Sequence, residues 1–232
     1  MALALFDLDD TLIDGDSATL WFDFLIEKGI APQSMQAEEH AMIQQYYRGE
    51  LAMEDYMVFT LQPLIGKTVE EVEAYMQELL HRSIVPRLFP QGLERLEWHR
   101  KRGDQIILIS ASGEQIVKPI AAYLGIDDVI AINLQQKEGR YTGQTEGVLS
   151  YQKGKVLRLQ AWLQEHPHSL KGSYAYSDSI NDVPMLEFVE MPWVINPAPH
   201  LEMLADQRGW FIAHWQRKQP DRSNLIPILL IK

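Results

Sequence analysis

Residues 3–11 read LALFDLDDT, and this stretch decides how the rest of the chain is interpreted. The apolar run Leu3 to Phe6 stops abruptly at a cluster of acids, which is typical of a short buried strand. Asp7 and Asp9 follow the end of that strand directly. Two carboxylates two positions apart beyond a strand can flank one reacting group. Asp10 is interpreted as a cap or a solvent-exposed acid.

Helices and strands are expected to alternate in the second part of the chain, which predicts a parallel sheet with helices on both faces. The fold class is therefore α/β, with a doubly wound, Rossmann-like parallel sheet. A hairpin or long loop is expected where three glycines occur between residues 135 and 147. Strands are predicted at Gln105–Ile109, Asp128–Asn133, Ser173–Tyr176 and Pro192–Ile195, and helices at about Gly92–Arg102, Glu114–Leu124 and Lys155–Gln164.

Residues 16–85 carry a helical pattern throughout, with apolar residues at helical spacing and no predicted strand. Thr68 with Glu71 three positions later is a capping-box signature for one of these helices. We predict two domains from this change of pattern. A small all-helical cap domain occupies 16–85, and an α/β core is formed by 1–15 together with 86–232.

The composition excludes several functional classes. The formal net charge is −11, which disfavours binding to nucleic acid and to acidic membrane surfaces. There is no cysteine, so disulfides, thiolate metal sites and a cysteine nucleophile are excluded. The start of the chain does not resemble a signal peptide, and no apolar run is long enough for a membrane span, so a cytoplasmic location is expected. The apolar end, LIPILLIK at 225–232, is interpreted as a terminal strand or docking tail.

Polar residues also follow other predicted strands. Ser110 comes directly after the apolar run IILI, and Asp178 follows SYAY with only Ser177 between. Ligands of parallel sheets bind beyond the carboxyl ends of the strands. We therefore expect Asp7, Ser110 and Asp178 to converge on one edge of the sheet.

The residue types at this edge suit a phosphoryl group. The Ser110 hydroxyl and the neighbouring backbone N–H groups of Ala111 and Ser112 can donate hydrogen bonds to an anion. Lys153 is the candidate for a fixed positive charge, with Lys155 as its competitor.

A divalent cation would relieve the repulsion between the clustered carboxylates of this edge, and hard oxygen ligands suit Mg²⁺. Asp178 and Asp182 lie four positions apart at the opening of a predicted helix, and Asn181 adds a neutral donor or acceptor. The alternative is that these acids are helix caps.

Together, these four motifs resemble those of the haloacid dehalogenase superfamily, in its phosphoserine-phosphatase-like branch with a helical cap inserted after the first motif. The resemblance covers residue 3 to about residue 196. It implies an α/β core with a helical cap, and a Mg²⁺ ion as cofactor. DLDDTL is similar to the first motif, ILIS to the second, Lys153 in QKGKVL to the third and YSDSIND to the fourth.

The resemblance also implies a role for each matched residue. Asp7 is the nucleophile and Asp9 the general acid and base. Asp7, the backbone carbonyl of Asp9, and Asp178 bind the metal. Ser110, Ala111 and Lys153 bind phosphate, and Thr11, Asn181 and Asp182 support the site.

The presence of Asp9 favours phosphoryl transfer, because the metal-independent dehalogenases of this family lack an acid at that position. The expected function is a Mg²⁺-dependent phosphomonoesterase that hydrolyses a small phosphorylated metabolite through an aspartyl phosphate. Asp16 stands where phosphoserine phosphatases have a glutamate that holds the substrate amino acid. No arginine to accompany it is evident in the cap segment 59–64, so the substrate stays open between phosphoserine, histidinol phosphate and related esters.

Two other functions remain as alternatives. A phosphotransferase or phosphomutase would pass the aspartyl phosphate to an alcohol instead of water, which product analysis with an added alcohol distinguishes. A non-catalytic phosphate-binding protein would lack one of the motif residues, and none is missing.

Overall fold

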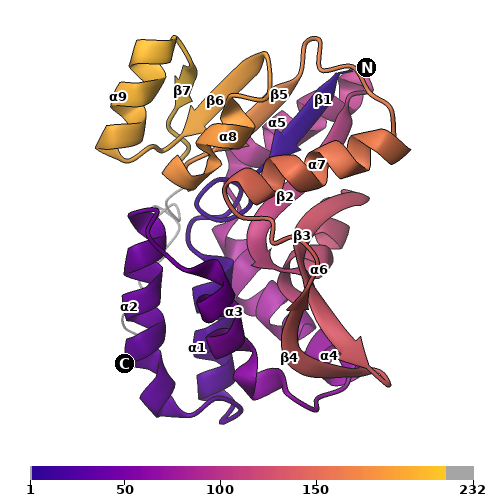
Figure 1. The fold of residues 1–232 in the computed structure, drawn as a ribbon. Coiled ribbons are helices and arrows are strands. Elements are labelled where there is room, and N and C mark those ends of the chain that lie inside the picture. Colours follow the sequence, from indigo (N-terminus) through magenta and orange to yellow (C-terminus); the bar gives the residue numbers. More distant parts are fainter. Residues whose placement is uncertain (1, 218–232) are drawn as a thin grey trace, which may run out of the picture.

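The computed structural model describes residues 2–217, which contain a seven-stranded sheet flanked by helices (Figure 1). The strand order is β4-β3-β2-β1-β5-β6-β7, so β1 lies in the middle. All neighbouring strands are parallel except β3 and β4, which form an antiparallel pair. The strands are β1 (Leu3–Phe6), β2 (Gln105–Gly113), β3 (Asp128–Lys137), β4 (Arg140–Glu146), β5 (Tyr174–Ser177), β6 (Met191–Ile195) and β7 (Phe211–Ala213).

Strand β1 is apolar at every position because both of its faces are covered. Successive side chains of a strand point to opposite faces. Leu3 and Leu5 join one buried cluster with α7 (Lys153–Glu165), α8 (Val183–Leu186) and α9 (Pro199–Arg208). Ala4 and Phe6 join a second cluster with α5 (Pro90–Arg102), α6 (Glu114–Leu124) and the N-terminal helices. A continuous apolar run is the pattern expected of a central parallel strand.

The helices are distributed over both faces of the sheet and beyond one of its ends. In Figure 1 the helices α1, α2 and α3 lie together at the lower left, on the same level as the β3–β4 hairpin. The helices are α1 (Ser17–Glu27), α2 (Gln36–Tyr47), α3 (Met53–Leu61), α4 (Val69–Leu79), α5 (Pro90–Arg102), α6 (Glu114–Leu124), α7 (Lys153–Glu165), α8 (Val183–Leu186) and α9 (Pro199–Arg208), with short 3-10 or π turns at Gln33–Met35, Gln62–Leu64, Leu80–Ile84, Val85–Arg87 and Ile180–Asp182.

All secondary-structure elements assigned between Ser17 and Arg87 are helices or short helical turns, as expected for this segment. The capping box at the start of α4 is present, with the Thr68 N–H donating to Glu71 Oε2 at 2.8 Å and the Glu71 N–H donating to Thr68 Oγ1 at 3.2 Å. Such a cap stabilises a helix by about 1 kcal/mol. The division into a cap domain and a core domain stays a prediction.

The expected α/β class with a mostly parallel sheet is confirmed. Helix α6 has the predicted bounds, and the segment predicted as a hairpin or long loop forms a hairpin with β3 through β4. Strand β2 runs four residues further than expected, to Gly113. No helix among residues 2–217 is long and apolar enough to cross a membrane. The apolar segment at 225–232 lies outside the described residues.

Candidate active site

Three strands bring the first group of predicted site residues together. Asp7 follows β1 directly and is only 3% exposed, and its N–H donates to the carbonyl of Tyr176 in β5 at 2.9 Å. Ser110 lies in β2, the neighbour of β1 on its other side, and is fully buried. Asp178 comes directly after β5. Residues more than 100 positions apart therefore meet at the carboxyl ends of neighbouring parallel strands.

A buried lysine connects the first and fourth motifs. Lys155 Nζ lies 2.7 Å from Asp7 Oδ1 and 2.7 Å from Asp182 Oδ2, and all three side chains are buried. Ser177 donates its hydroxyl to the same Asp182 oxygen at 2.7 Å. Burial alone would lower the pKa of Lys155, but the adjacent Asp182 and Asp7 outweigh it and raise this pKa. Lys155 is therefore a fixed positive charge in direct contact with Asp7.

The structure corrects the choice between the two lysines of the third motif. Lys153, the lysine favoured as the fixed positive charge, is exposed at the first position of α7, whereas its competitor Lys155 lies beside Asp7. Residues two positions apart in a helix point about 200° apart around its axis, so only one of the two can face the sheet. Gly154 between them passes against the carbonyl of Leu149, where a side chain would collide. This close approach places Lys155 over β1.

Burial raises the pKa of Asp7 to about 8. Lys155 opposes this rise, whereas the negative charges of Asp182 and Asp9 add to it. Burial therefore opposes ionisation of Asp7, and Lys155 is the adjacent positive charge that favours it.

Hydrogen bonds from both sides fix the carboxylate of Asp9. Oδ1 accepts from the N–H of Ser17 at 2.6 Å, and Oδ2 accepts from the hydroxyls of Ser112 at 2.9 Å and Ser110 at 3.4 Å. The contributions of Ser17 and Ser112 were not predicted, since isolated serines carry no sequence signal. The N–H of Ser112, expected to bind an anion, instead donates to Ser110 Oγ at 3.0 Å. Ala111 is half-buried between the two serines.

Two residues of the fourth motif, Asp178 and Asn181, form hydrogen bonds with other parts of the chain. Thr11 Oγ1 accepts from the Asp178 N–H at 3.0 Å and lies 3.1 Å from Asp178 Oδ1, to which it donates. Asn181 contacts the helical segment, because its Nδ2 donates to the carbonyl of Tyr46 at 2.9 Å. Its Oδ1 accepts from the hydroxyl of Tyr151 at 3.1 Å. Thr11 thus contacts Asp178 directly and Asn181 connects the fourth motif to α2, and their supporting role stays a prediction.

The donor set at this edge fits a magnesium ion. Burial, followed by the charges of Asp7, Asp10 and Asp182, raises the pKa of Asp178 well above its usual range. The ammonium of Lys155 contacts two of these carboxylates, those of Asp7 and Asp182. No group of three or more acidic or histidine side chains among residues 2–217 is placed to hold a metal. The expected set contains only two carboxylates and one backbone carbonyl, and Mg²⁺ commonly completes its shell with water.

Two further acids connect the site with the helical segment. Asp16 is the N-cap of α1, and its Oδ1 accepts from the N–H of Thr19 at 2.7 Å. Asp10 adopts a positive φ of 51°, and its Oδ2 accepts from the hydroxyl of Tyr47 at 3.2 Å. A cavity of about 510 Å³ opens beside Asp10, Tyr47 and Asp178. A ligand in this cavity can therefore contact Asp178 as well as Tyr47 of α2.

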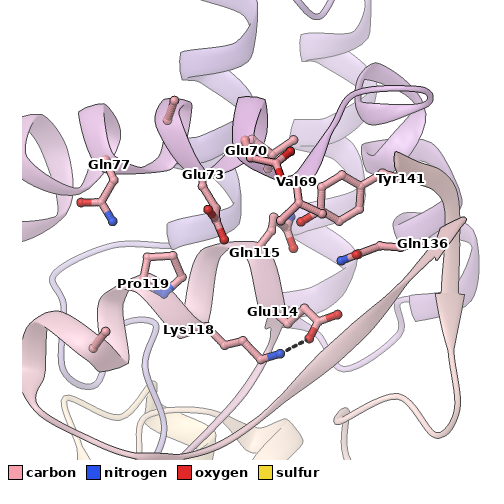
Figure 2. Close-up of a pocket in the computed structure, with 13 residues that line it drawn as sticks. Val69, Glu70, Glu73, Gln77, Glu114, Gln115, Lys118, Pro119, Gln136 and Tyr141 are labelled. Carbon is pink, nitrogen blue, oxygen red and sulfur yellow. Dashed lines mark hydrogen bonds and ion pairs between the residues drawn. The ribbon is translucent and has the colours of Figure 1, made fainter. Parts of the chain in front are cut away.

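A different cavity of about 590 Å³ lies between α4, α6 and the β3–β4 hairpin (Figure 2). Its polar residues include Glu73, Glu114, Lys118 and Tyr141. None of the predicted site residues lines it. This cavity is therefore separate from the predicted site at the strand ends.

The chain matches the family model described as haloacid dehalogenase-like hydrolase over residues 4–187. A histidinol-phosphatase from Neisseria meningitidis serogroup C is 34% identical over 219 residues, which span 92% of this chain and 99% of that protein. A phosphoserine phosphatase from Mycobacterium tuberculosis is 29% identical and is covered over 70% of its length, with 91% of this chain matched.

Solved structures share the fold. A crystal structure of a Bordetella pertussis Tohama I protein of unknown function matches with a TM-score of 0.83 and 38% identity, over 91% of this chain and 97% of that one. A phosphoserine phosphatase, solved as a phospho-aspartyl intermediate analogue, matches with a TM-score of 0.69 and 21% identity over 94% of both chains. The second likeness concerns the fold alone.

Proposed function

Since the chain belongs to the haloacid dehalogenase-like hydrolase family, in its phosphoserine-phosphatase-like branch, and is a phosphatase, we propose that it hydrolyses a small phosphomonoester through a phosphorylated Asp7. One observation carries this proposal: the buried contact of Lys155 Nζ with Asp7 Oδ1 at 2.7 Å, beside the hydrogen-bonded carboxylate of Asp9. This arrangement combines a nucleophile, a positive charge and a second acid at the end of one strand.

In the first step an oxygen of Asp7 attacks phosphorus, and the bond from phosphorus to the ester oxygen breaks. The electron pair of that bond goes to the leaving alkoxide, which takes a proton from the carboxyl group of Asp9. The products are an aspartyl phosphate and the free alcohol. The hydrogen bonds from Ser17 and Ser112 orient Asp9 for this transfer.

In the second step a water molecule attacks the phosphorus of the aspartyl phosphate. Asp9, now ionised, accepts a proton from this water, and the bond between phosphorus and Asp7 breaks. Inorganic phosphate leaves and the carboxylate of Asp7 is restored. The ammonium of Lys155 balances negative charge in both steps, and Ser110 offers a hydroxyl to the phosphoryl oxygens.

A bound Mg²⁺ would neutralise phosphoryl charge and favour the ionised form of Asp7. Asp7, the backbone carbonyl of Asp9, and Asp178 are the residues that would hold it. Thr11 fixes the carboxylate of Asp178 for this purpose through its hydrogen bond at 3.1 Å.

Histidinol phosphate is the favoured substrate among the two small phosphoesters suggested by relatives. The relative named histidinol-phosphatase matches this chain at 34% identity and over 99% of its own length. The relative named phosphoserine phosphatase is less similar, at 29%. The cap segment 59–64 also contains no arginine to receive the carboxylate of phosphoserine.

The test is release of inorganic phosphate from p-nitrophenyl phosphate, histidinol phosphate and phosphoserine by the purified chain with Mg²⁺. We expect turnover with Mg²⁺, loss of turnover with excess EDTA, and recovery when Mg²⁺ is added back. An added acceptor alcohol should not become phosphorylated. Transfer to that alcohol in preference to water would contradict hydrolysis and favour a phosphotransferase.

A further inference from the structure

Gln152, which directly precedes α7, has a backbone conformation that is unfavourable for any residue with a side chain. Its φ is 49° and its ψ is −122° at the N-cap of this helix. Glycine adopts a positive φ without strain, whereas a residue with a Cβ keeps it only where the surrounding structure compensates. The N–H of Lys155 donates to the carbonyl of Gln152 at 3.2 Å, so the strained residue begins the turn that carries the buried lysine. A glutamine at this position therefore requires an explanation.

The side-chain amide of Gln152 connects three segments of the chain. Its Nε2 donates to Asn181 Oδ1 at 3.1 Å and to the carbonyl of Gly49 at 3.3 Å, and it lies 3.1 Å from the hydroxyl of Tyr151. Asn181 belongs to the fourth motif and is buried, and Gly49 lies two positions after the end of α2. The start of α7, the fourth motif and the end of α2 thus meet at one amide group.

The hydrogen bonds of Asn181 fix the direction of this contact. Its Nδ2 donates to the carbonyl of Tyr46 at 2.9 Å, and a carbonyl oxygen can only accept. Asn181 Oδ1 therefore faces Gln152 and Tyr151 and accepts from both. The NH₂ group of Gln152 serves this oxygen and the carbonyl of Gly49 together. A carboxylate in its place would offer neither of them a donor.

The end of α2 lies directly on the fourth motif. Gly49 has a φ of 73°, and a Cβ at this residue would lie 3.3 Å from Asn181 Oδ1, which is closer than ordinary van der Waals contact. The ring centroid of Tyr46 lies 5.8 Å from that of Tyr151. Burial first, and then the charge of Asp7 with those of other site acids, raises the pKa of Tyr46. The end of α2 is therefore close to the carboxylates of the proposed reaction.

The same helix contributes to the cavity beside Asp178. Gln44 and Tyr47 of α2 line this cavity of about 510 Å³ together with Asp178. Two backbone carbonyls at the end of α2 accept hydrogen bonds from the side-chain amides of Asn181 and Gln152. Displacement of this end would leave both amides without these acceptors, which is unfavourable. The position of the cavity wall that α2 contributes therefore depends on the two amides.

We propose that Gln152 is a positioning residue of the phosphatase, because its side-chain amide holds the end of α2 against the fourth motif and so fixes the cavity wall beside Asp178. This inference rests on the proposed function and adds a residue to it. Gln152 acts through Asn181 and Gly49, and its contacts with them compensate for the strain of its backbone.

The first test compares Gln152→Ala with Gln152→Gly, because both variants lack the amide and only the alanine keeps the backbone strain. We expect kcat/KM for p-nitrophenyl phosphate to fall by about tenfold in both variants. The Tm of Gln152→Gly should exceed that of Gln152→Ala by about 2 °C or more, because glycine accepts the positive φ. A merely structural residue would make activity follow stability. Activity of Gln152→Gly within about twofold of the unaltered protein would therefore overturn the proposal.

Hydrogen–deuterium exchange provides a second measurement, which reports on the end of α2 without turnover. The N–H groups of Gly49 and Glu50 each donate to a backbone carbonyl of α2 at 2.9 Å. In both variants these amides should exchange at least about fivefold faster, whereas the amides of β1 should be unchanged. Unchanged exchange at Gly49 and Glu50 would overturn the proposal. If the unaltered protein hydrolyses none of the tested phosphoesters but the variants show this exchange pattern, the proposed function is refuted and the contact of Gln152 with α2 stands.

Discussion

The end of the central sheet and the interior of the helical segment both hold buried acids, but the acids have different partners in the two regions. At the sheet, Asp7 and Asp182 share the ammonium of Lys155 at 2.7 Å each. In the helical segment, Asp16 and Glu39 have hydrogen-bond donors and no buried cation. The carboxylates that Lys155 balances belong to the proposed reaction centre, where the chemistry is the same for every phosphoester. In the helical segment, by contrast, burial raises the pKa of both acids, whose closest partners are hydrogen-bond donors.

The largest effect is expected from a substitution of Asp7, which lies at the carboxyl end of the central strand. Asp7→Asn keeps the size of the side chain and removes the nucleophile. We expect kcat for p-nitrophenyl phosphate to fall by at least about 1,000-fold, with the circular dichroism spectrum unchanged. Residual turnover within about tenfold of the unaltered protein would contradict the role of Asp7.

The two lysines of α7 provide a matched pair for the second prediction. Lys155→Met leaves Asp7 and Asp182 buried without their cation, and we expect a loss of about 3 kcal/mol in the free energy of unfolding. Activity should fall by about 100-fold or more, because a fixed charge near the phosphoryl group is lost. Lys153→Met, at an exposed position, should change stability by less than about 0.5 kcal/mol. Urea unfolding and kinetics measure both effects, and a more harmful Lys153→Met would reverse the assignment.

A smaller effect is expected from weakening the proposed metal site. Asp178→Asn removes one anionic ligand, and the concentration of Mg²⁺ that gives half-maximal activity should rise by about tenfold or more. Activity at saturating Mg²⁺ should recover further than it does in Asp7→Asn. Titration of both variants with MgCl₂ measures this difference. An unchanged Mg²⁺ requirement in Asp178→Asn would exclude Asp178 as a ligand.

The strand ends, and hence most of the candidate site, could be predicted because apolar runs stop at polar residues there. Asp7, Ser110 and Asp178 each follow such a run, and parallel strands end at the same edge. The choice between Lys153 and Lys155 could not be made in this way. Both lie in the first turn of α7, and only the packing of that helix against the sheet determines which one points inward.

The burial of Glu39 could not be predicted from the sequence for a related reason. The pattern QAEEHAMI contains two adjacent glutamates, and their sequence context does not distinguish them. Glu39 is buried because α2 packs with α1 and α3, which bring Thr19 and Tyr56 to its carboxylate. Burial of an acid therefore depends on tertiary packing between helices, which local residue patterns do not encode.

The smallest effect concerns the stability of the helical segment. Burial raises the pKa of Glu39 above its ordinary value of 4.5. The unfolded chain therefore loses this proton at lower pH than the folded protein does, and stability decreases as the pH rises above about 4.5. Glu39→Gln should raise the Tm at pH 8 and gain less as the pH falls toward 4.5. Thermal unfolding of both proteins across this range measures the difference, and a lower Tm at pH 8 would contradict it.

The most direct test of the whole account is the site of phosphorylation during turnover. The protein is mixed with p-nitrophenyl phosphate and Mg²⁺, quenched in acid within its first turnovers, and digested for peptide mass spectrometry. We expect one phosphoryl group on Asp7, which hydroxylamine removes and which is absent from Asp7→Asn. Turnover without any protein-bound phosphoryl group, or with the group on another residue, would contradict it.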